Sequence, residues 1–180
     1  MRKKLNSESG LTLVEMLCAV AILVLLVLLL STGMQMALRT YRDIVAQSEV
    51  DLLLSTAVDA IADDLRYAQD VSKSGANFTY TSDSFGKDAS IIVSDDEKSK
   101  GQIMVGGMRL LPTGAYGLNR AYEVAEMKID PGGLDDSAAK EITFTINLTV
   151  KTTDGRISAA TPDSGVTVRC LNPKKDATGG

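Results

Sequence analysis

The 180-residue sequence contains no histidine, which excludes many kinds of catalytic site. Histidine is the usual general base, a member of most nucleophilic triads and a ligand in most catalytic zinc sites. The glycines also form neither the G-x-x-x-x-G-K-[ST] nor the G-x-G-x-x-G pattern that binds phosphate groups. We therefore expect a protein that is not an enzyme and that binds no nucleotide, metal or cofactor.

Cysteine and proline are also scarce. Cys18 lies inside an apolar run and Cys170 near the other end of the chain, so we expect no internal disulfide. Cys170 is predicted to point into a core from a strand, and an intermolecular bridge through it is the alternative. No proline occurs before Pro112, so none interrupts a long helix in the first half of the chain.

Cations are outnumbered by acids. The chain has 19 Lys and Arg against 23 Asp and Glu, a formal charge of −4. Removing residues 1–10 would leave 16 against 22, or −6. Binding to nucleic acid needs an excess of Lys and Arg to displace counterions from phosphates, so no nucleic-acid partner is expected.

What the sequence does have is a long apolar run from Leu11 to Leu30. Its only clearly polar residues are Thr12 and Glu15, and the run is long enough to cross a bilayer as one helix. A carboxylate within a bilayer costs about 2.5–3.5 kcal/mol on insertion scales, so Glu15 needs a partner or a purpose. No Lys or Arg follows it before Arg39.

This N-terminal region resembles the class III signal sequence of type IV prepilins and pseudopilins. In that family a short basic leader ends in Gly, an apolar residue follows, and Glu is fifth in the mature chain. Here the leader is residues 1–10, the cut would fall between Gly10 and Leu11, and Glu15 is fifth after the cut. The sequence differs from the commonest pattern in having Leu11 in place of Phe. It also has Ser31-Thr32-Gly33 where many pilins carry a Pro.

The resemblance implies how the chain is processed and assembled. A prepilin peptidase would cut after Gly10, Leu11 would be methylated, and Glu15 would meet the N-terminal amine of a neighbouring subunit. Within one helix that amine lies about 6 Å along the axis from Glu15. The implied partners are other pilins, an assembly ATPase and a platform protein. The absence of a C-terminal cysteine pair favours a minor pilin or pseudopilin.

The charges flanking the apolar run predict its orientation. Three cations at residues 2–4 precede the run, while Arg39 and Arg42 follow it at a greater distance. The positive-inside rule therefore places the N-terminus in the cytoplasm and the C-terminal domain outside. An extracellular or periplasmic filament would follow. The alternative is a signal anchor for an extracytoplasmic binding module that never polymerises, which leaves Glu15 unexplained; an anchored hydrolase is disfavoured by the missing histidine.

The rest of the sequence predicts an α+β, pilin-like fold in which one long helix packs on an antiparallel sheet. The helix is predicted from about Leu11 to about Gln69. We expect a leader at 1–10, a transmembrane and filament-core helix at 11–33, an amphipathic helix at 34–70, a loop plus sheet at 71–172 and a disordered tail at 173–180. Residues spaced by three and four predict a stripe that packs on the sheet of the same subunit. The stripe comprises Leu38, Tyr41, Val45, Leu54, Val58, Ile61, Leu65 and Ala68.

Beyond the helix, residues 72–87 are rich in Ser, Thr, Gly and Asn and are predicted as a loop with Phe78 and Tyr80 partly buried. Gly106-Gly107 and Asp154-Gly155 predict turns. Strands are predicted at 89–94, 102–105, 108–112, 121–130, 141–152 and 165–172. The strand at 141–152 is the clearest, because apolar and polar residues alternate along it. The segment 130–136 offers oxygen ligands for Ca²⁺ but lacks EF-hand spacing, so an acidic turn is the default.

Overall fold

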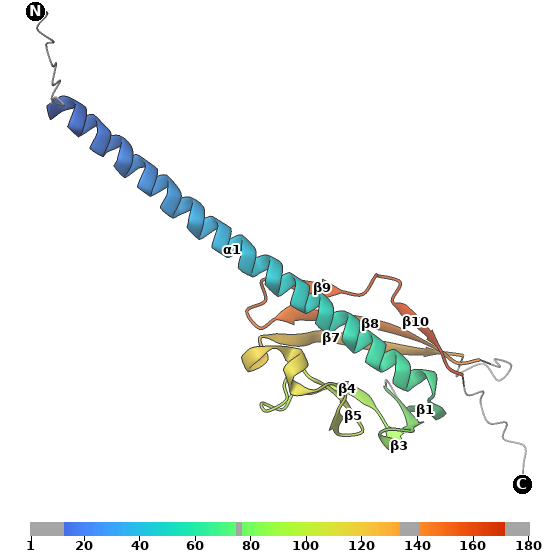
Figure 1. The fold of residues 1–180 in the computed structure, drawn as a ribbon. Helices are drawn as coiled ribbons and strands as arrows, with labels where there is room; N and C mark the ends of the chain where they lie inside the picture. The colour runs from blue at the N-terminus through green and yellow to red at the C-terminus, as the bar shows by residue number, and fades with distance from the viewer. Residues whose placement is uncertain (1–12, 75–76, 134–140, 172–180) are drawn as a thin grey trace, which may run out of the picture. The chain divides into compact units, whose positions relative to one another are not determined.

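A single long helix, α1 (Leu13–Arg66), is the first element of this computed structural model (Figure 1). The structure describes residues 13–74, 77–133 and 141–171. The chain divides into two compact units, Met1–Ile44 and Val45–Gly180, and each is described by itself. The long helix was predicted correctly, although it ends shortly before Gln69, where the first strand begins.

In the first unit, every described residue of α1 is solvent-exposed. Leu38 and Tyr41, which were predicted to pack on the sheet of the same subunit, are 48% and 66% exposed. The prediction is wrong for these two residues. It is also wrong for Val45, which begins the second unit and is 37% exposed, because burial of the helix begins only at Val50.

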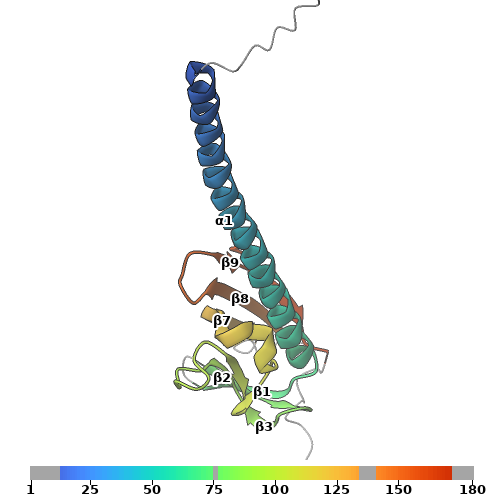
Figure 2. The same ribbon diagram turned by 60° about the vertical axis from the view of Figure 1, so that its left-hand side comes forward.

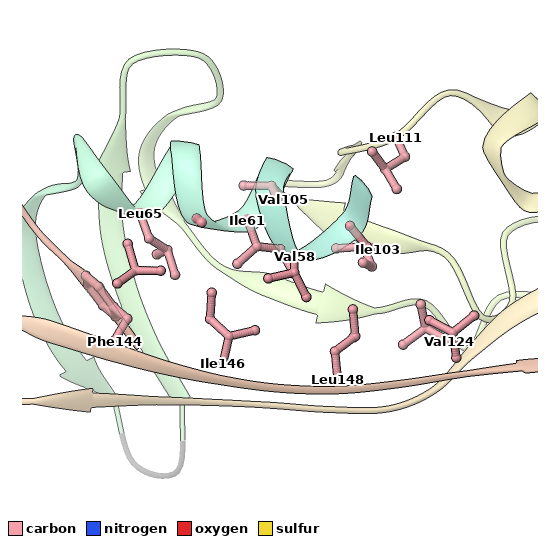
Figure 3. Packing of buried hydrophobic residues seen from close by; sticks show 14 of the residues in the cluster. Val58, Ile61, Leu65, Ile103, Val105, Leu111, Val124, Phe144, Ile146 and Leu148 are labelled. Atoms are coloured by element: carbon pink, nitrogen blue, oxygen red, sulfur yellow. The ribbon is translucent and has the colours of Figure 1, made fainter. Parts of the chain in front are cut away.

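In the second unit, the remaining turns of α1 bury one face against the sheets. Figure 3 shows Val58, Ile61 and Leu65 pointing from the helix toward Ile146 and Leu148 of the strand below. The spacing of three and four residues keeps these side chains on one side of the helix. The buried helix residues are Val50, Leu53, Ala57, Val58, Ile61, Ala62 and Leu65.

The largest sheet is built around β8 (Thr143–Thr152), the strand predicted most clearly from alternation. Every second side chain of β8, from Phe144 to Thr152, is buried, and the residues between them are only partly covered. β7 (Tyr122–Gly132) pairs with β8 along one edge. β9 (Ser158–Ala160) and β10 (Val166–Arg169) pair with successive parts of the other edge. All of these pairings are antiparallel.

Two smaller antiparallel sheets complete the unit. One contains β4 (Ile91–Val93), β5 (Ile103–Val105) and β6 (Met108–Arg109). Its β5–β6 turn is the predicted Gly106-Gly107, where φ is +56° and +83°, a conformation that favours glycine. Two short 3₁₀ helices, η1 (Thr113–Tyr116) and η2 (Leu118–Arg120), then lead into β7. Neither they nor β9 were predicted, because each is very short.

The other small sheet overturns the prediction of a loop at 72–87. β1 (Gln69–Ser74), β2 (Asn77–Ser82) and β3 (Gly86–Ala89) form an antiparallel sheet beside the C-terminal end of α1 (Figure 2). Phe78 and Tyr80 are buried, with 6% and 1% exposure, rather than partly buried. Their rings stack at 5.8 Å, and Phe78 also lies 5.4 Å from the ring of Phe144. Alternating aromatic burial therefore outweighs the polar composition of this segment.

The burial of the second cysteine was predicted correctly, although the residue comes directly after a strand and not within one. Cys170 follows β10, is 5% exposed, and its thiol donates a hydrogen bond to the carbonyl oxygen of Ala68 at 3.2 Å. It therefore joins the end of the sheet to the residues just after α1. The predicted disordered tail at 173–180 lies outside the described residues.

Candidate functional site

Of the predicted site residues, Glu15 is the one that the structure describes. Glu15 is in the first turn of the helix and is exposed. A carboxylate in this position is favoured by the helix dipole, typically by about 0.3–1 kcal/mol. Gly10 and Leu11, the predicted processing and methylation positions, lie outside the described residues, so their roles stay predictions.

The surface that follows Glu15 is apolar on every side of the helix. The most apolar 18-residue window of α1 has a mean hydropathy of 3.1, and none of it is buried. Leu13, Leu23 and Leu30, for example, are 81%, 61% and 72% exposed. Full burial of one such side chain is worth about 1.5–3 kcal/mol, so this surface strongly favours transfer into a bilayer or against other apolar helices.

The helix continues without a break through Ser31-Thr32-Gly33, the segment that stands where many pilins have Pro. The Thr32 hydroxyl donates to the carbonyl oxygens of Leu28 at 3.1 Å and Leu29 at 3.0 Å. This back-bonding often bends a helix, and glycine inside a helix costs about 1 kcal/mol relative to alanine. These three residues are therefore a weak point of α1, although they remain helical.

Comparison with known families gives one match to this region. The family described as the prokaryotic N-terminal methylation motif matches residues 5–31. This range covers the predicted cut site, Glu15 and the apolar run. Residues 5–31 are therefore a type IV prepilin-like signal sequence. Together with the α+β architecture, in which one long N-terminal helix precedes antiparallel sheets, the motif supports a type IV pilin- or pseudopilin-type precursor. Searches of curated proteins and of solved structures found no match to this chain.

The signal motif carries general consequences for processing and location. It implies cleavage by a prepilin peptidase and assembly with other pilins. The motif and the exposed apolar helix also fit anchoring in a membrane. The match covers only the N-terminal part of the chain, so it supports no finer assignment within the pilin class.

A cluster of polar side chains, which the sequence did not predict, joins α1 to β2. The hydroxyl groups of Tyr80 and Ser82 both donate to the Asp64 carboxylate, the latter at 2.6 Å. Ser82 Oγ in turn accepts hydrogen bonds from the backbone N–H groups of Ser84 and Phe85, both at 3.1 Å. Burial and the contact with Asp64 raise the pKa of Tyr80, which keeps its phenol protonated as a donor. Both hydroxyls come from a different element of the fold than Asp64, so sequence spacing gave no signal of the cluster.

This cluster borders a groove of about 450 Å³ in the second unit. The groove is lined by Ala60, Asp63, Asp64, Tyr67, Asp83, Ser84, Phe85 and Leu110. Asp63 pairs with Arg66 at 3.1 Å, and Asp83 accepts a hydrogen bond from the Gln69 amide at 3.3 Å. Each carboxylate therefore has a partner within the fold: Asp63 pairs within α1, Asp83 joins the turn after β2 to β1, and Asp64 ties α1 to β2.

The remaining candidate, the acidic segment 130–136, is only partly described. Asp130 lies at the exposed end of β7 and pairs with Lys128 at 3.2 Å, while residues 134–136 lie outside the described ranges. Among the described residues, no three His, Cys, Asp or Glu side chains are grouped so that they would hold a metal ion.

Proposed function

We propose that this chain is a structural subunit of a type IV pilus or of a type II secretion-like pseudopilus. The observation that carries the proposal is the coincidence of the methylation motif at residues 5–31 with an apolar helix that its own fold leaves exposed. In this proposal the subunit is stored in the cytoplasmic membrane, with its N-terminus inside and its C-terminal domain outside, and is then drawn into a filament.

The assembly contact is proposed at the start of α1. Prepilin peptidase cuts after Gly10 and leaves a cationic amine on Leu11, which is then methylated. Glu15 of an incoming subunit pairs with the amine of its neighbour, so each charge offsets the cost of burying the other. Packing of the apolar segments forms the filament core. The exposed position of Glu15 in the first helical turn supports this contact.

The chain is proposed to act without catalysis of its own. Its sequence has no histidine and no phosphate-binding glycine motif, so the work of extraction is assigned to an assembly ATPase acting with a platform protein. The missing C-terminal cysteine pair supports a minor pilin or pseudopilin.

The experiment that tests the proposal is the intact mass and N-terminal sequence of the membrane-extracted protein. It is made in cells that contain an active prepilin peptidase, with a peptidase-deletion strain as the control. We expect a chain that begins at Leu11 and is heavier by one methyl group only where the peptidase is present. A chain that still begins at Met1 in the peptidase-positive cells would make α1 an ordinary membrane anchor.

A further inference from the structure

A charge pattern in α1 occurs twice with the same spacing. Between residues 11 and 44 the sequence has only two acids, Glu15 and Asp43, and two basic side chains, Arg39 and Arg42. Asp43 follows Arg39 at the same interval at which Glu15 follows the amine that cleavage would create on Leu11. The second cation–acid pair lies four heptads further along the helix than the first.

The second pair is not closed within its own helix. Arg39 and Asp43 are both exposed, and neither takes part in an ion pair among the residues that the structure describes. An ion pair between positions i and i+4 of one helix is also weaker when the cation precedes the acid, as it does here. Both side chains are therefore available to a second molecule.

Apolar side chains beside this pair are also exposed to solvent. Leu38, Tyr41 and Ile44 are 48%, 66% and 63% exposed, and they belong to the first unit together with Arg39 and Asp43. Packing of another helix against them would remove water from the neighbouring charges. The Coulomb attraction between two charges grows as their surroundings lose water, and a matched partner offsets the cost of removing each charge from water.

The axial offset between neighbouring helices, which the proposed function supplies, determines which charged residues meet. Pairing of the residue 11 amine with Glu15 of a neighbour offsets two parallel helices by about four residues, or about 6 Å along the axis. If the helices stay parallel, the same offset brings Arg39 of one copy level with Asp43 of its neighbour. Arg42 comes level with Ala46, which carries no charge.

The separation of the two pairs by four heptads matches left-handed packing of the neighbouring helices. Helices that coil around each other with a left hand repeat every heptad, so in such packing both pairs lie on the same side of the helix. A straight helix drifts by about 20° per heptad, which would turn the two pairs apart by about 80°. Left-handed packing at a shallow crossing angle is a common solution for neighbouring helices.

We propose that Arg39 of one copy of this chain forms an ion pair with Asp43 of the neighbouring copy, as a second register contact in a left-handed helix assembly. This proposal rests on the proposed function, because the offset between copies is taken from the contact between the Leu11 amine and Glu15. It adds a partner, a second copy of this chain, and a contact position four heptads along the same helix.

The test uses charge reversal in two differently tagged full-length copies expressed together with the pilus machinery. R39D and D43R each place like charges at the contact, and each alone should lower the amount of subunit in the sheared filament fraction by about two- to five-fold. R42D is the matched control and should incorporate as the wild type does. Co-expression of R39D with D43R should restore incorporation, because alternating copies again place opposite charges side by side.

The mixed expression separates a contact between copies from one within a helix. Within each variant helix the charges at 39 and 43 remain alike, so an intrahelical pair cannot be rescued by mixing. The proposal is overturned if both variants incorporate as well as R42D does, if mixing fails to restore incorporation, or if two tagged wild-type copies never copurify in filaments. Glu15→Ala, measured in parallel, tests the proposed function separately. If Glu15→Ala blocks incorporation into filaments while the mixture of R39D and D43R is not rescued, the contact between Arg39 and Asp43 is refuted and the proposed function stands.

Discussion

Truncation of Ile61 tests whether the face of α1 in the second unit holds that unit together. Ile61 is fully buried and points toward β8 (Figure 3). Ile61→Ala removes three carbon atoms, which is worth about 2.4 kcal/mol of lost transfer free energy. The cavity that remains adds to this cost, and such truncations typically cost about 2–5 kcal/mol. We expect the free energy of unfolding to fall by about 3 kcal/mol.

The measurement is urea unfolding of the whole processed protein in a mild detergent. The chain has no tryptophan, so tyrosine fluorescence and near-ultraviolet circular dichroism report the transition. Tyr80, Tyr116 and Tyr122 are all buried in the second unit and give the signal. The matched control is Leu52→Ala on the same helix, where the side chain is 65% exposed and the expected change is within about 0.5 kcal/mol.

The same variant tests the independence of the two units. Ile61 belongs to the second unit, whereas the signal sequence lies in the first, so peptidase processing of Ile61→Ala should equal that of the wild type. A loss of stability below about 1 kcal/mol would refute the assignment of this helix face to the core. Loss of processing in a variant that is still membrane-inserted would refute the separation of the two roles.

Four further outcomes are expected. Glu15→Ala should be cleaved normally but should be missing from sheared filaments, as seen by immunoblotting of both fractions; normal incorporation would rule out the charge-pair contact. Gly10→Phe should remain at precursor mass while the second unit keeps the urea midpoint of the wild type, and a normally shortened product would argue against a cut after Gly10. Tyr80→Phe leaves the buried ring in place but removes a donor to Asp64, so it should cost about 1–2 kcal/mol in urea, whereas Tyr41→Phe at a 66% exposed site should be neutral. Hydrogen bonds from the Thr152 hydroxyl and then from Arg156 lower the pKa of Asp154 to about 2, so its carboxyl should titrate there by nuclear magnetic resonance and return toward about 4 in Thr152→Val. Because the pKa of Asp154 is depressed in the folded state, its ionised carboxylate stabilises the fold above about pH 4, and this stabilisation is lost as the pH falls toward about 2. An unchanged titration midpoint of Asp154 in Thr152→Val would contradict the assignment of the shift to the Thr152 hydroxyl.

The sequence was most informative where one simple pattern extends over many residues. The apolar run and the spacing from Gly10 to Glu15 predicted the signal motif, and spacing of three and four residues predicted the packing of Val58, Ile61 and Leu65. Strict alternation likewise predicted β8. Each of these patterns repeats the same physical preference many times, so a single exception does not hide it.

Prediction failed where the deciding contact lies far away in the sequence. β2 looked like a loop because Ser, Thr and Asn surround its two aromatic residues, yet Phe78 is held by Phe144, which belongs to a different sheet much later in the chain. The hydroxyl of Tyr80 reaches back to Asp64 on the helix. For Leu38 and Tyr41 the prediction failed in the opposite way, because it expected buried side chains and both are exposed. Their periodicity is real, but it does not tell whether the covering surface belongs to the same chain or to another one.

The exposed apolar surface explains why Glu15 would decide between storage and assembly. Lipid tails are about as apolar as leucine side chains, so moving the helix from a bilayer into a bundle of like helices changes its hydrophobic free energy little. The carboxylate differs, because burial in lipid costs about 2.5–3.5 kcal/mol, and the proposed pairing with a neighbour's amine would offset that cost in the bundle. An apolar helix alone would therefore be held equally well in either place. In the proposed assembly, Glu15 would supply a preference for the assembled state and would set the offset at which Arg39 meets Asp43.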